Sequence, residues 1–529
     1  MKESKKIIYF LDFVNCLGGS NKVLLTQAYI MKQRGYQVKM VIPVQDWRQP
    51  IEECNEVCRR YGLEILRASY SISICLENID ILKALRDCKD IVKLLKEDKP
   101  DLIHSSQLNI AVELAARDLR IPHLMNIYPV NWETFNLNWM KIYPQYHSTD
   151  SLLFAERWGK GLGIPSRCIR VAYEEDTSNR KSIEVQKHTE VQGHEAITIL
   201  SMGVFSEHKN QLEMLEFVLQ CKRDEKNVKM VFLGANNNAY GKKCREFVDK
   251  FGLEDCVEFE GFVLNIEDYL QEADLFILAS TVESFPGVIV ESMANRVPII
   301  STPVAGVPEL LVDEKNGFLT EGFKGGHIYE AFLRYLVFRE NGQITQLVEN
   351  AYITYLENHT YMAVGNQLDD YYQWIMEDYG KKNYFYLTAD IIDQKIQEMF
   401  MPNNWDEVDS EMKNRIWFLY HVFSKIEQKD NKEIAIWGAG FWGGRVLEWI
   451  RIWGKETYFT GFIDTKKTGE YLGYPIVQDN ESVISECGTI FIAMENKKSM
   501  LEIMEYLERF GKIRNQDYFL VYNSPVIRI

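Results

Sequence analysis

Short apolar runs alternate with longer amphipathic segments along most of the chain. The first third contains such runs at Ile7–Phe13, Val38–Pro43, Leu102–His104 and Leu124–Tyr128, with helical periodicity between them. Strands that alternate with helices of this length are typical of βαβ units and a parallel sheet. We therefore expect a Rossmann-like α/β domain over residues 1–175.

The alternation stops over residues 176–195 and then returns. This gap is rich in Thr, Ser, Asn, Lys, Gln and His and lacks apolar periodicity, which predicts an exposed linker between domains. The expected strands behind it are Ile197–Met202, Val228–Leu233, Val257–Phe259, Leu275–Leu278 and Val297–Ser301. With the helical sequence that follows, they predict a second α/β domain over residues 196–380.

A third unit closes the sequence. Residues 384–429 have a helical pattern and are interpreted as a spacer, after which Ile434–Trp437 begins another α/β pattern. We expect a small Rossmann-like domain over residues 430–529. A chain of 529 residues is long enough for about three domains.

Composition and charge narrow the class of protein. The chain is 46% hydrophobic and 26% charged, as in soluble globular proteins, and its net charge of −16 argues against nucleic acid as a partner. Its ten cysteines are scattered without a zinc motif, which favours reduced thiols. Asp12 and Asn15 interrupt the first apolar run, and no run reaches the roughly 18–20 apolar residues of a membrane span. We expect a cytoplasmic protein, or one peripheral to the inner face of a membrane.

One predicted helix, Ile81–Lys99, is basic and amphipathic. Its apolar stripe lies beside Lys83, Arg86, Lys89 and further cations. Such a helix can dock on anionic lipid, and it can equally be a solvated surface helix.

Two glutamates flank the point where an apolar strand gives way to a helix. Glu283 and Glu291 lie eight residues apart, after the apolar run Ala273–Ser280, and Pro286 and Gly287 between them open the helix. Carboxylates accept hydrogen bonds from hydroxyls, and helix N-terminal amides bind phosphate. A nucleotide sugar fits this pattern, with hydroxyls at both ends and a diphosphate between. The alternative is that a glutamate here only complements the helix dipole, worth about 0.3–1 kcal/mol.

Further polar and glycine-rich segments end neighbouring strands of the same predicted domain. They are Gly203 with Ser206–Asn210, Gly234–Asn236, Glu260–Val263, Pro298–Pro303 and Gly306–Glu309. Ligands of open α/β sheets collect at the carboxyl ends of the strands. These segments are therefore expected to face one cleft.

With these residues the chain resembles the retaining nucleotide-sugar glycosyltransferases of family 4, which have the two-domain GT-B fold. The family's hallmark is Glu, seven residues, Glu, an apolar helix, and a Pro-Ile/Val-Ile/Val strand. Here it reads Glu283 to Glu291, Ser292-Met293-Ala294, then Val297–Ser301. Gly203, Lys209, Gly261 and Asn316-Gly317 complete the pattern in the same order. The resemblance is dense over residues 197–320 and looser over 7–130.

The resemblance implies a role for each matched residue. Glu283 would face the donor sugar hydroxyls, Glu291 the ribose diol, and Lys209 the diphosphate. Backbone at Phe262-Val263 would lie against the base, and the amides of Phe285, Gly287 and Val288 would hold phosphate. The remaining donor-side positions are Gly203, the loop glycines Gly18 and Gly19, and Tyr128. The Gly18-Gly19 pair equally suits a simple tight turn.

The implied reaction is a hexosyltransferase-type transfer from a UDP- or GDP-linked sugar to a glycan or lipid-linked acceptor, with retention, in bacterial surface polysaccharide or glycolipid synthesis. No Asp-x-Asp pair occurs in the sequence, so we expect a metal-independent enzyme with no required cofactor. Charge on the leaving diphosphate would then be met by Lys209, amides and the helix dipole, each donor worth roughly 2.7–4 kcal/mol. Neither glutamate need act as a nucleophile, unlike the carboxylate pair of retaining glycosidases.

Two positions depart from the family's usual pattern. Many members of the family have Arg directly after the glycine matched by Gly203, and in this sequence that residue is Val204. The family's usual His at the end of the Leu124–Tyr128 strand is replaced here by Tyr128. Losing one cation on the diphosphate costs about 1.5–3 kcal/mol. His208 is a candidate to replace it.

The third unit carries its own glycine motif. Gly438, Gly440 and Gly443 follow a strand and precede the helix expected at Gly444–Trp453, and Asp464 lies 21 residues beyond Gly443. This context is that of a dinucleotide-binding fingerprint. It resembles the nucleotide-binding domain beside bacterial sugar acyltransferases. We expect a second nucleotide site with a binding, regulatory or assembly role, or a domain that keeps the fold without a ligand.

Two other functions remain open at this point. A nucleotide-sugar epimerase on a GT-B scaffold would share the donor site and need an acid/base group beside the sugar. A non-catalytic partner would keep the fold and lose the chemistry, for which Val204 and Tyr128 are the relevant positions.

Overall fold

The computed structural model describes residues 4–12, 19–44, 52–70, 81–107, 109–128, 144–162, 164–174, 196–263, 265–381, 426, 429–430, 433–452, 454–514 and 516–521. The expected linker over 176–195 lies outside these residues, as does nearly all of the expected spacer over 384–429.

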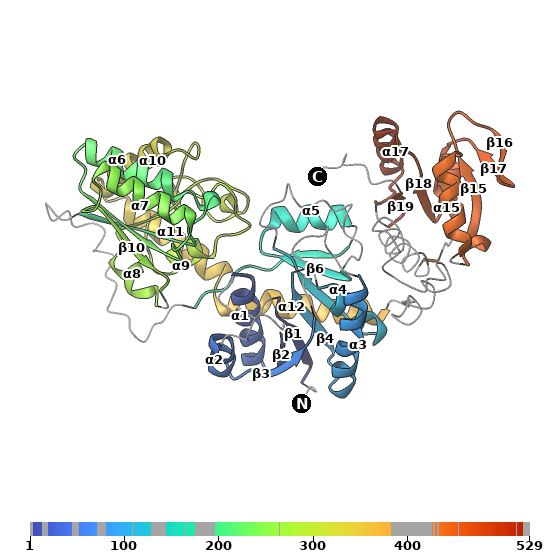
Figure 1. Cartoon of the computed structure of the whole chain (residues 1–529), viewed down its shortest axis with the longest axis horizontal. Helices are drawn as coiled ribbons and strands as arrows, with labels where there is room; N and C mark the ends of the chain where they lie inside the picture. The colour runs from blue at the N-terminus through green and yellow to red at the C-terminus, as the bar shows by residue number, and fades with distance from the viewer. Residues whose placement is uncertain are drawn as a thin grey trace.

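Three separate sheets organise the chain (Figure 1). The first sheet has seven parallel strands in the order β3-β2-β1-β4-β5-β6-β7. The strands are β1 (Lys6–Phe10), β2 (Gln37–Pro43), β3 (Glu64–Ala68), β4 (Leu102–Ser106), β5 (His123–Asn126), β6 (Tyr146–Thr149) and β7 (Ser166–Cys168). The helices are α1 (Gly19–Gln33), α2 (Glu52–Arg60), α3 (Ile81–Glu97), α4 (Ile110–Asp118) and α5 (Leu152–Leu162).

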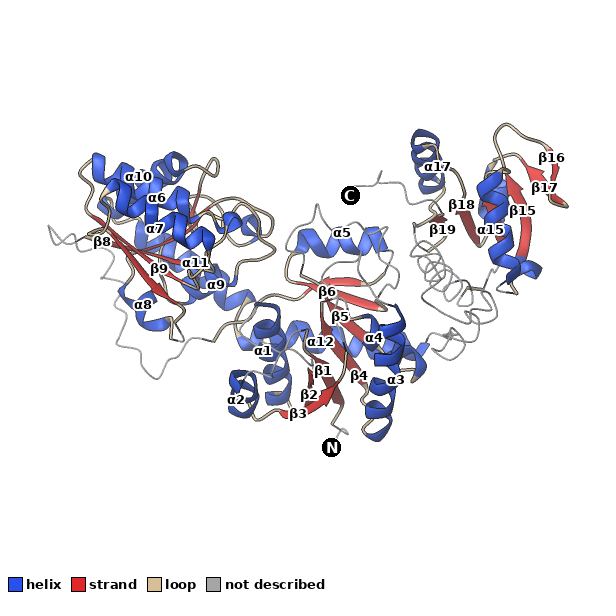
Figure 2. Cartoon of the chain, viewed as in Figure 1, coloured by secondary structure: helices blue, strands red, loops and turns tan. Residues whose placement is uncertain are grey.

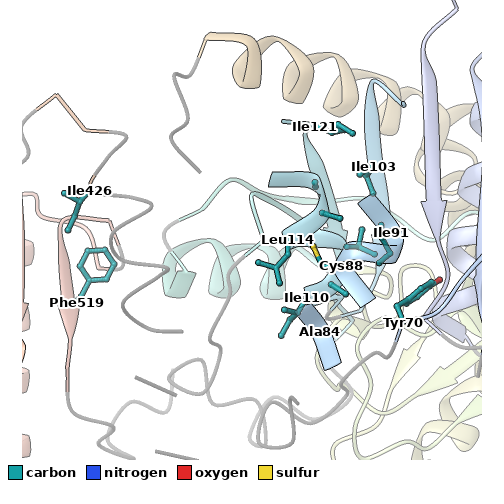
Figure 3. Packing of buried hydrophobic residues seen from close by; sticks show 14 of the residues in the cluster. Tyr70, Ala84, Cys88, Ile91, Ile103, Ile110, Leu114, Ile121, Ile426 and Phe519 are labelled. Atoms are coloured by element: carbon teal, nitrogen blue, oxygen red, sulfur yellow. The ribbon is translucent and has the colours of Figure 1, made fainter. Parts of the chain in front are cut away.

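Both faces of the first sheet are buried, because alternate residues of each strand point to opposite sides. Ile8 and Phe10 of β1 pack with Ile91 of α3 and Leu114 of α4. Figure 3 shows the buried side chains of α3 and α4 gathered beside this sheet. Ile7, Tyr9 and Leu11 point to the other face, where α1 lies.

The helix α12 (Tyr361–Lys381) packs on that second face of the first sheet. The hydroxyl of Tyr372 in α12 forms hydrogen bonds with the hydroxyl of Tyr9 at 2.9 Å and with Nδ1 of His104 at 2.5 Å. All three side chains are fully buried. His104, to which the sequence assigned no role, is therefore part of the core. The sequence grouped residues up to 380 with the second domain, whereas α12 contributes to the core of the first sheet.

The second sheet has six parallel strands in the order β10-β9-β8-β11-β12-β13. They are β8 (Ile197–Met202), β9 (Val228–Leu233), β10 (Val257–Gly261), β11 (Leu275–Leu278), β12 (Ile299–Ser301) and β13 (Phe318–Leu319). The helices are α6 (Gln211–Arg223), α7 (Ala239–Phe251), α8 (Glu267–Glu272), α9 (Gly287–Ala294), α10 (Gly325–Glu340) and α11 (Ile344–Asn358). Ile277 packs on the α6 and α10 side and Phe276 on the α9 side, so this sheet too is covered on both faces (Figure 2).

The third sheet has the order β16-β17-β15-β14-β18-β19, antiparallel only between β16 and β17. Its strands are β14 (Ile434–Trp437), β15 (Phe459–Ile463), β16 (Gly469–Tyr471), β17 (Tyr474–Val477), β18 (Thr489–Ile492) and β19 (Tyr518–Leu520). Its helices are α15 (Phe441–Ile452), α16 (Glu481–Glu486) and α17 (Lys497–Arg509). The α/β class with a further C-terminal sheet is confirmed.

The predicted apolar strands were placed well. β8, β9, β11 and β14 begin and end at the predicted residues. The sequence did not identify β3, β6 and β7. β3 and β7 are short edge strands with partly exposed side chains, and β6 has the polar sequence Tyr-His-Ser-Thr.

The basic helix α3 uses its apolar stripe within the fold. Ile91 and Leu95 are fully buried in the core beside α4, while Lys89, Lys93 and Lys96 are exposed. Among the side chains of α3 that the structure describes, the exposed ones are all charged. Among the described residues, no helix is both long and apolar enough to cross a membrane.

Candidate functional site

The two glutamates lie at the carboxyl-terminal edge of the second sheet. β11 ends at Leu278, Glu283 lies in the loop after it, and Glu291 lies in α9, which begins at Gly287. Their side chains are nearly buried, with exposed fractions of 11% for Glu283 and 10% for Glu291. A buried carboxylate needs a cation or hydrogen-bond donors, and each of the two has a lysine partner.

Lys209 is the partner of Glu283. The Nζ atom of Lys209 lies 2.5 Å from Oε1 of Glu283, joining the turn after β8 to the loop after β11. Gly203, at the end of β8, lies against the aliphatic part of Lys209. Gly203 also lies so close to Gly234 that a Cβ on Gly234 would stand 2.0 Å from the Gly203 carbonyl oxygen. The structure thus brings Gly203, Lys209 and Glu283 together.

The start of α9 presents backbone amides beside these side chains. Pro286 is the N-cap with extended φ and ψ, so Gly287 and Val288 occupy the first helical positions, whose N–H groups have no partner inside a helix. The preceding residue, Phe285, is buried, with the His359 ring 5.6 Å away and the Arg170 guanidinium 4.9 Å above its own ring. Phe285 anchors the loop, and any phosphate contact there would come from its backbone.

Lys22 is the partner of Glu291, and the sequence did not single it out. The Nζ atom of Lys22, in the first turn of α1, lies 2.8 Å from Oε1 of Glu291. The pair joins the first sheet's helix to α9 of the second. Glu291 raises the pKa of Lys22, so the ammonium stays charged. The sequence feature that could have pointed to Lys22 is its position shortly after the Gly18-Gly19 pair.

A second contact between the two sheets involves Asp150 and Ser284. The Ser284 hydroxyl donates to Oδ1 of Asp150 at 2.6 Å, so the first sheet holds the residue next to Glu283. Asp150 follows β6 and is buried, which raises the pKa of its carboxyl to about 7, while the bond from Ser284 lowers it in part. The sequence did not identify Asp150, because the strand before it is polar.

Glu309 forms a third contact between the sheets. Its carboxylate accepts hydrogen bonds from the Ser151 hydroxyl, from the amides of Leu152 and Leu153 at the start of α5, and from Arg170. Burial opposes ionisation, but these donors together lower the pKa of Glu309. The Glu309 carboxylate, from the side of the second sheet, therefore accepts hydrogen bonds from the first amides of α5, a helix of the first sheet.

Tyr128, predicted to stand near the donor sugar, follows β5 and is 8% exposed. Its hydroxyl accepts a hydrogen bond of 2.9 Å from Nδ2 of Asn126. Burial, and then the nearby Asp150, raise the pKa of Tyr128 well above its usual value, so the phenol stays neutral and can donate a proton in a hydrogen bond.

The remaining predicted residues vary in position. Gly18 lies outside the described residues, and Gly19 begins α1. Phe262 is exposed and Val263 half-buried after β10, as a surface for a base requires. Burial, and then Lys209, lower the pKa of His208, which opposes its protonation.

In the third sheet, Asp464 faces the glycine loop. Its Oδ2 accepts from the Ala439 amide at 3.1 Å, and its Oδ1 accepts from the amides of Lys466 and Lys467 at 2.9 and 3.1 Å. Gly443 allows close packing, because a Cβ there would lie 2.0 Å from the Gly438 carbonyl oxygen. Asp464 thus joins the loop to the end of β15.

Within the described residues, no three or more His, Cys, Asp and Glu side chains gather in an arrangement that suits a metal ion.

Comparisons with known proteins show which family part of this chain resembles. The family model for glycosyl transferases group 1 matches residues 182–343. The chain is 23% identical over 334 residues to an uncharacterized glycosyltransferase of Haemophilus influenzae, covering 60% of this chain and 86% of that protein. It is 28% identical over 198 residues to AmsK, an amylovoran biosynthesis glycosyltransferase of Erwinia amylovora, covering 34% of this chain and 46% of that protein.

The fold has close counterparts among solved structures. The crystal structure of Anabaena HepE in complex with UDP superposes with a TM-score of 0.57 at 18% identity, covering 70% of this chain and all of that chain, 100%. Residues 182–343 therefore form a glycosyltransferase group 1 domain, carried on a GT-B fold to which a third α/β sheet is appended.

Proposed function

We propose that this chain transfers a hexose from a nucleotide-diphosphate sugar to a glycan or lipid-linked acceptor, with retention of configuration and without a metal. The observation that carries the proposal is the pairing of Lys209 with Glu283 beside the first amides of α9, in the segment matched by the group 1 family.

Each part of this arrangement suits one part of the donor. Glu283 would accept from the sugar hydroxyls and Glu291 from the ribose diol, because both are acceptors at opposite ends of the loop and helix start. The amides of Phe285, Gly287 and Val288 would meet the diphosphate between them. Exposed Phe262 and half-buried Val263 would lie against the base, and Gly19 would lie near the donor phosphates and the acceptor.

In the proposed reaction the acceptor hydroxyl attacks the anomeric carbon from the face that the diphosphate leaves. The bond from that carbon to the phosphate oxygen breaks, and the acceptor's proton passes to the departing phosphate oxygen. Sugar hydroxyls that occupy Glu283 would release Lys209 toward the leaving group. A preorganised donor at developing charge is worth about 2.7–4 kcal/mol of barrier.

The acceptor is proposed from the relatives. Several named relatives act in polysaccharide synthesis, AmsK in amylovoran biosynthesis among them. A surface polysaccharide or glycolipid made at the inner face of a membrane fits the exposed lysines of α3, which would approach anionic lipid through charge alone. A cytoplasmic site is part of the same proposal.

A thermal-shift panel of UDP, GDP, ADP and their sugars with the full chain tests the donor. One nucleotide series should raise the melting temperature. Glu291→Ala should weaken this binding, and Lys209→Ala should weaken it further, since it removes a charge from the diphosphate. If no nucleotide raises the melting temperature, a non-catalytic partner becomes the better description.

Product analysis distinguishes transfer from the alternative enzyme. Transfer releases free nucleotide diphosphate and gives a glycoside whose anomeric configuration matches that of the donor by NMR. An epimerase would return an altered nucleotide sugar without net release of nucleotide diphosphate.

A further inference from the structure

Lys22 extends from the first sheet's α1 to Glu291 in α9 of the second. Its Nζ lies 2.8 Å from Oε1 of Glu291, and its side chain remains 64% exposed, against 10% for Glu291. The carboxylate is therefore fixed in a largely buried place, while the ammonium is at the end of a flexible and mostly solvated chain. Only Lys22 can change partner at low cost.

We propose that Lys22 is the second cation for the donor diphosphate, supplied by the first sheet, and that it exchanges Glu291 for a phosphate oxygen when ribose occupies Glu291. This inference rests on the proposed function, since it requires a nucleotide-diphosphate donor at α9. It assigns to Lys22 a positioning and charge-neutralising role that the group 1 segment, residues 182–343, does not contain.

The distances along α9 make the exchange short. Glu291 lies four residues after Gly287, which is about 6 Å along a helix. A diphosphate held by the Gly287 and Val288 amides is then about one helical turn from Nζ of Lys22. A lysine ammonium has three donors and a rotatable stem, so it can reach a phosphate without movement of α1.

Charge around Lys22 favours the same exchange. Glu291, and to a lesser degree Glu267, hold the ammonium in its charged form and raise its pKa. When ribose hydroxyls donate to Glu291, the ammonium loses part of its partner, and the nearest new anion is the diphosphate. The two Lys–Glu pairs, Lys22 with Glu291 and Lys209 with Glu283, would then respond to the two ends of one donor.

The local chain offers a reason for a cation from the first sheet. Val204 is uncharged, and burial, and then Lys209, lower the pKa of His208, which opposes its protonation. Lys209 alone among the residues 204–209 then carries positive charge toward the diphosphate.

The experiment compares binding of a nucleoside diphosphate, its monophosphate and its nucleoside to the full chain by calorimetry. Uridine compounds are used, or guanosine compounds if those are the ones the wild type binds. Lys22→Met should lower the affinity for the diphosphate by about tenfold or more, the value of a hydrogen bond between charged groups. Nucleoside affinity should stay the same or rise, because Glu291 no longer has a competing partner.

Three further variants complete the comparison. Lys22→Arg should keep diphosphate affinity within a few-fold, because charge is retained. Lys93→Met, an exposed lysine on α3, should bind every compound as the wild type does. Glu291→Gln should show the reverse pattern from Lys22→Met, losing affinity for the nucleoside.

The outcomes separate this inference from the proposed function. If the wild type binds the diphosphate but Lys22→Met loses equal affinity for diphosphate and nucleoside, or loses none, Lys22 does not contact phosphate. If the wild type binds no nucleotide at all, the donor itself is wrong and both proposals fail together.

Discussion

The hydroxyl of Ser284 lies 2.6 Å from Oδ1 of Asp150, and this hydrogen bond attaches the loop that carries Glu283 to the first sheet. Ser284 is adjacent to Glu283, so any change at Asp150 is transmitted to the proposed sugar-binding carboxylate. The Asp150 carboxyl is buried near Tyr128, with Arg170 as the nearby cation. Its protonation therefore affects both the stability of the fold and the position of the site.

Asp150→Asn should remove a pH-dependent part of the stability. The pKa of Asp150 is raised from 3.8 to about 7, so the folded protein binds a proton that the unfolded chain releases between these values. Stability from this group is thus greatest at low pH and falls as pH rises toward 7, at about 1.4 kcal/mol for each unit of pKa difference. The stability of Asp150→Asn relative to wild type should increase from pH 4.5 to pH 7.5 in chemical denaturation.

Burial lowers the pKa of a histidine, so buried histidines change stability with pH in the opposite sense to Asp150. The prediction is therefore tested on the difference in stability between Asp150→Asn and wild type. His104 and His147 have pKa values lowered to about 3 by burial, and their contribution is present in both proteins. Ser284→Ala provides the second control, because it removes the bond without removing the titrating group. A difference curve that is flat with pH would contradict a raised pKa at Asp150.

Glu309→Ala should loosen the contact between the first two sheets. Removing this carboxylate leaves Arg170 without its carboxylate partner and the first amides of α5 without their acceptor. We expect a loss of roughly 2–4 kcal/mol in the free energy of unfolding. Glu314→Ala, an exposed glutamate paired with Arg334, is the matched control and should cost less than about 1 kcal/mol.

The same variant should alter the solution shape. Small-angle scattering with and without donor nucleotide would show a broader distribution of distances in Glu309→Ala than in wild type. Equal stability of Glu309→Ala and Glu314→Ala would mean that the first two sheets are held together by other contacts.

The sequence was sufficient for the buried centre of each sheet. β8, β9 and β11 are continuous apolar runs between turn residues, and such runs identify parallel strands without further information. Gly203, Lys209 and Glu283 were predictable for a related reason, because residues at the carboxyl ends of neighbouring parallel strands must meet.

Contacts between the first and second sheets were not predictable in this way. Lys22, Asp150 and Glu309 have their partners more than 130 residues away, and no local periodicity relates them. β6 was missed because Ser148 and His147 are buried as polar residues that hydrogen-bond to Asn126 and Ser166. A polar strand of this kind has no apolar run to reveal it.

Lys209→Met should lower kcat by about 10²- to 10³-fold, the usual loss for one preorganised donor at a developing negative charge. Rates per folded molecule are needed, since Glu283 would also lose its cation. Lys243→Met, an exposed lysine 3.5 Å from Glu207, should keep the wild-type kcat. If Lys209→Met changes KM but not kcat, Lys209 binds the donor in its ground state only.

Tyr128→Phe should reduce kcat/KM for the donor by about tenfold while costing little stability. Nδ2 of Asn126 would still donate to Oε1 of Gln27 at 2.9 Å, so the loss of the phenol leaves this amide with one partner. Tyr9→Phe is the matched control: its hydroxyl is buried against that of Tyr372 in the core of the first sheet. Tyr9→Phe should lower stability by about 1 kcal/mol and leave the kinetics unchanged. If Tyr128→Phe instead lowers stability and leaves kcat/KM unchanged, Tyr128 is a residue of the core and does not act on the donor.

The sequence predicts either a second nucleotide site in the third sheet or a domain that keeps the fold without a ligand, and Asp464→Asn distinguishes the two. The amides of Gly438 and Ala439 already donate to Ile463 and Asp464, so a diphosphate would use amides at the start of α15. Asp464 accepts from the Ala439 amide and so holds the glycine loop in place before α15. Its replacement should therefore weaken nucleotide binding at this sheet. We expect two binding events in wild type by calorimetry, one in Lys209→Ala, and one in Asp464→Asn with transfer activity retained. A single event in wild type that Lys209→Ala abolishes would show that the third sheet keeps its glycine loop for packing alone.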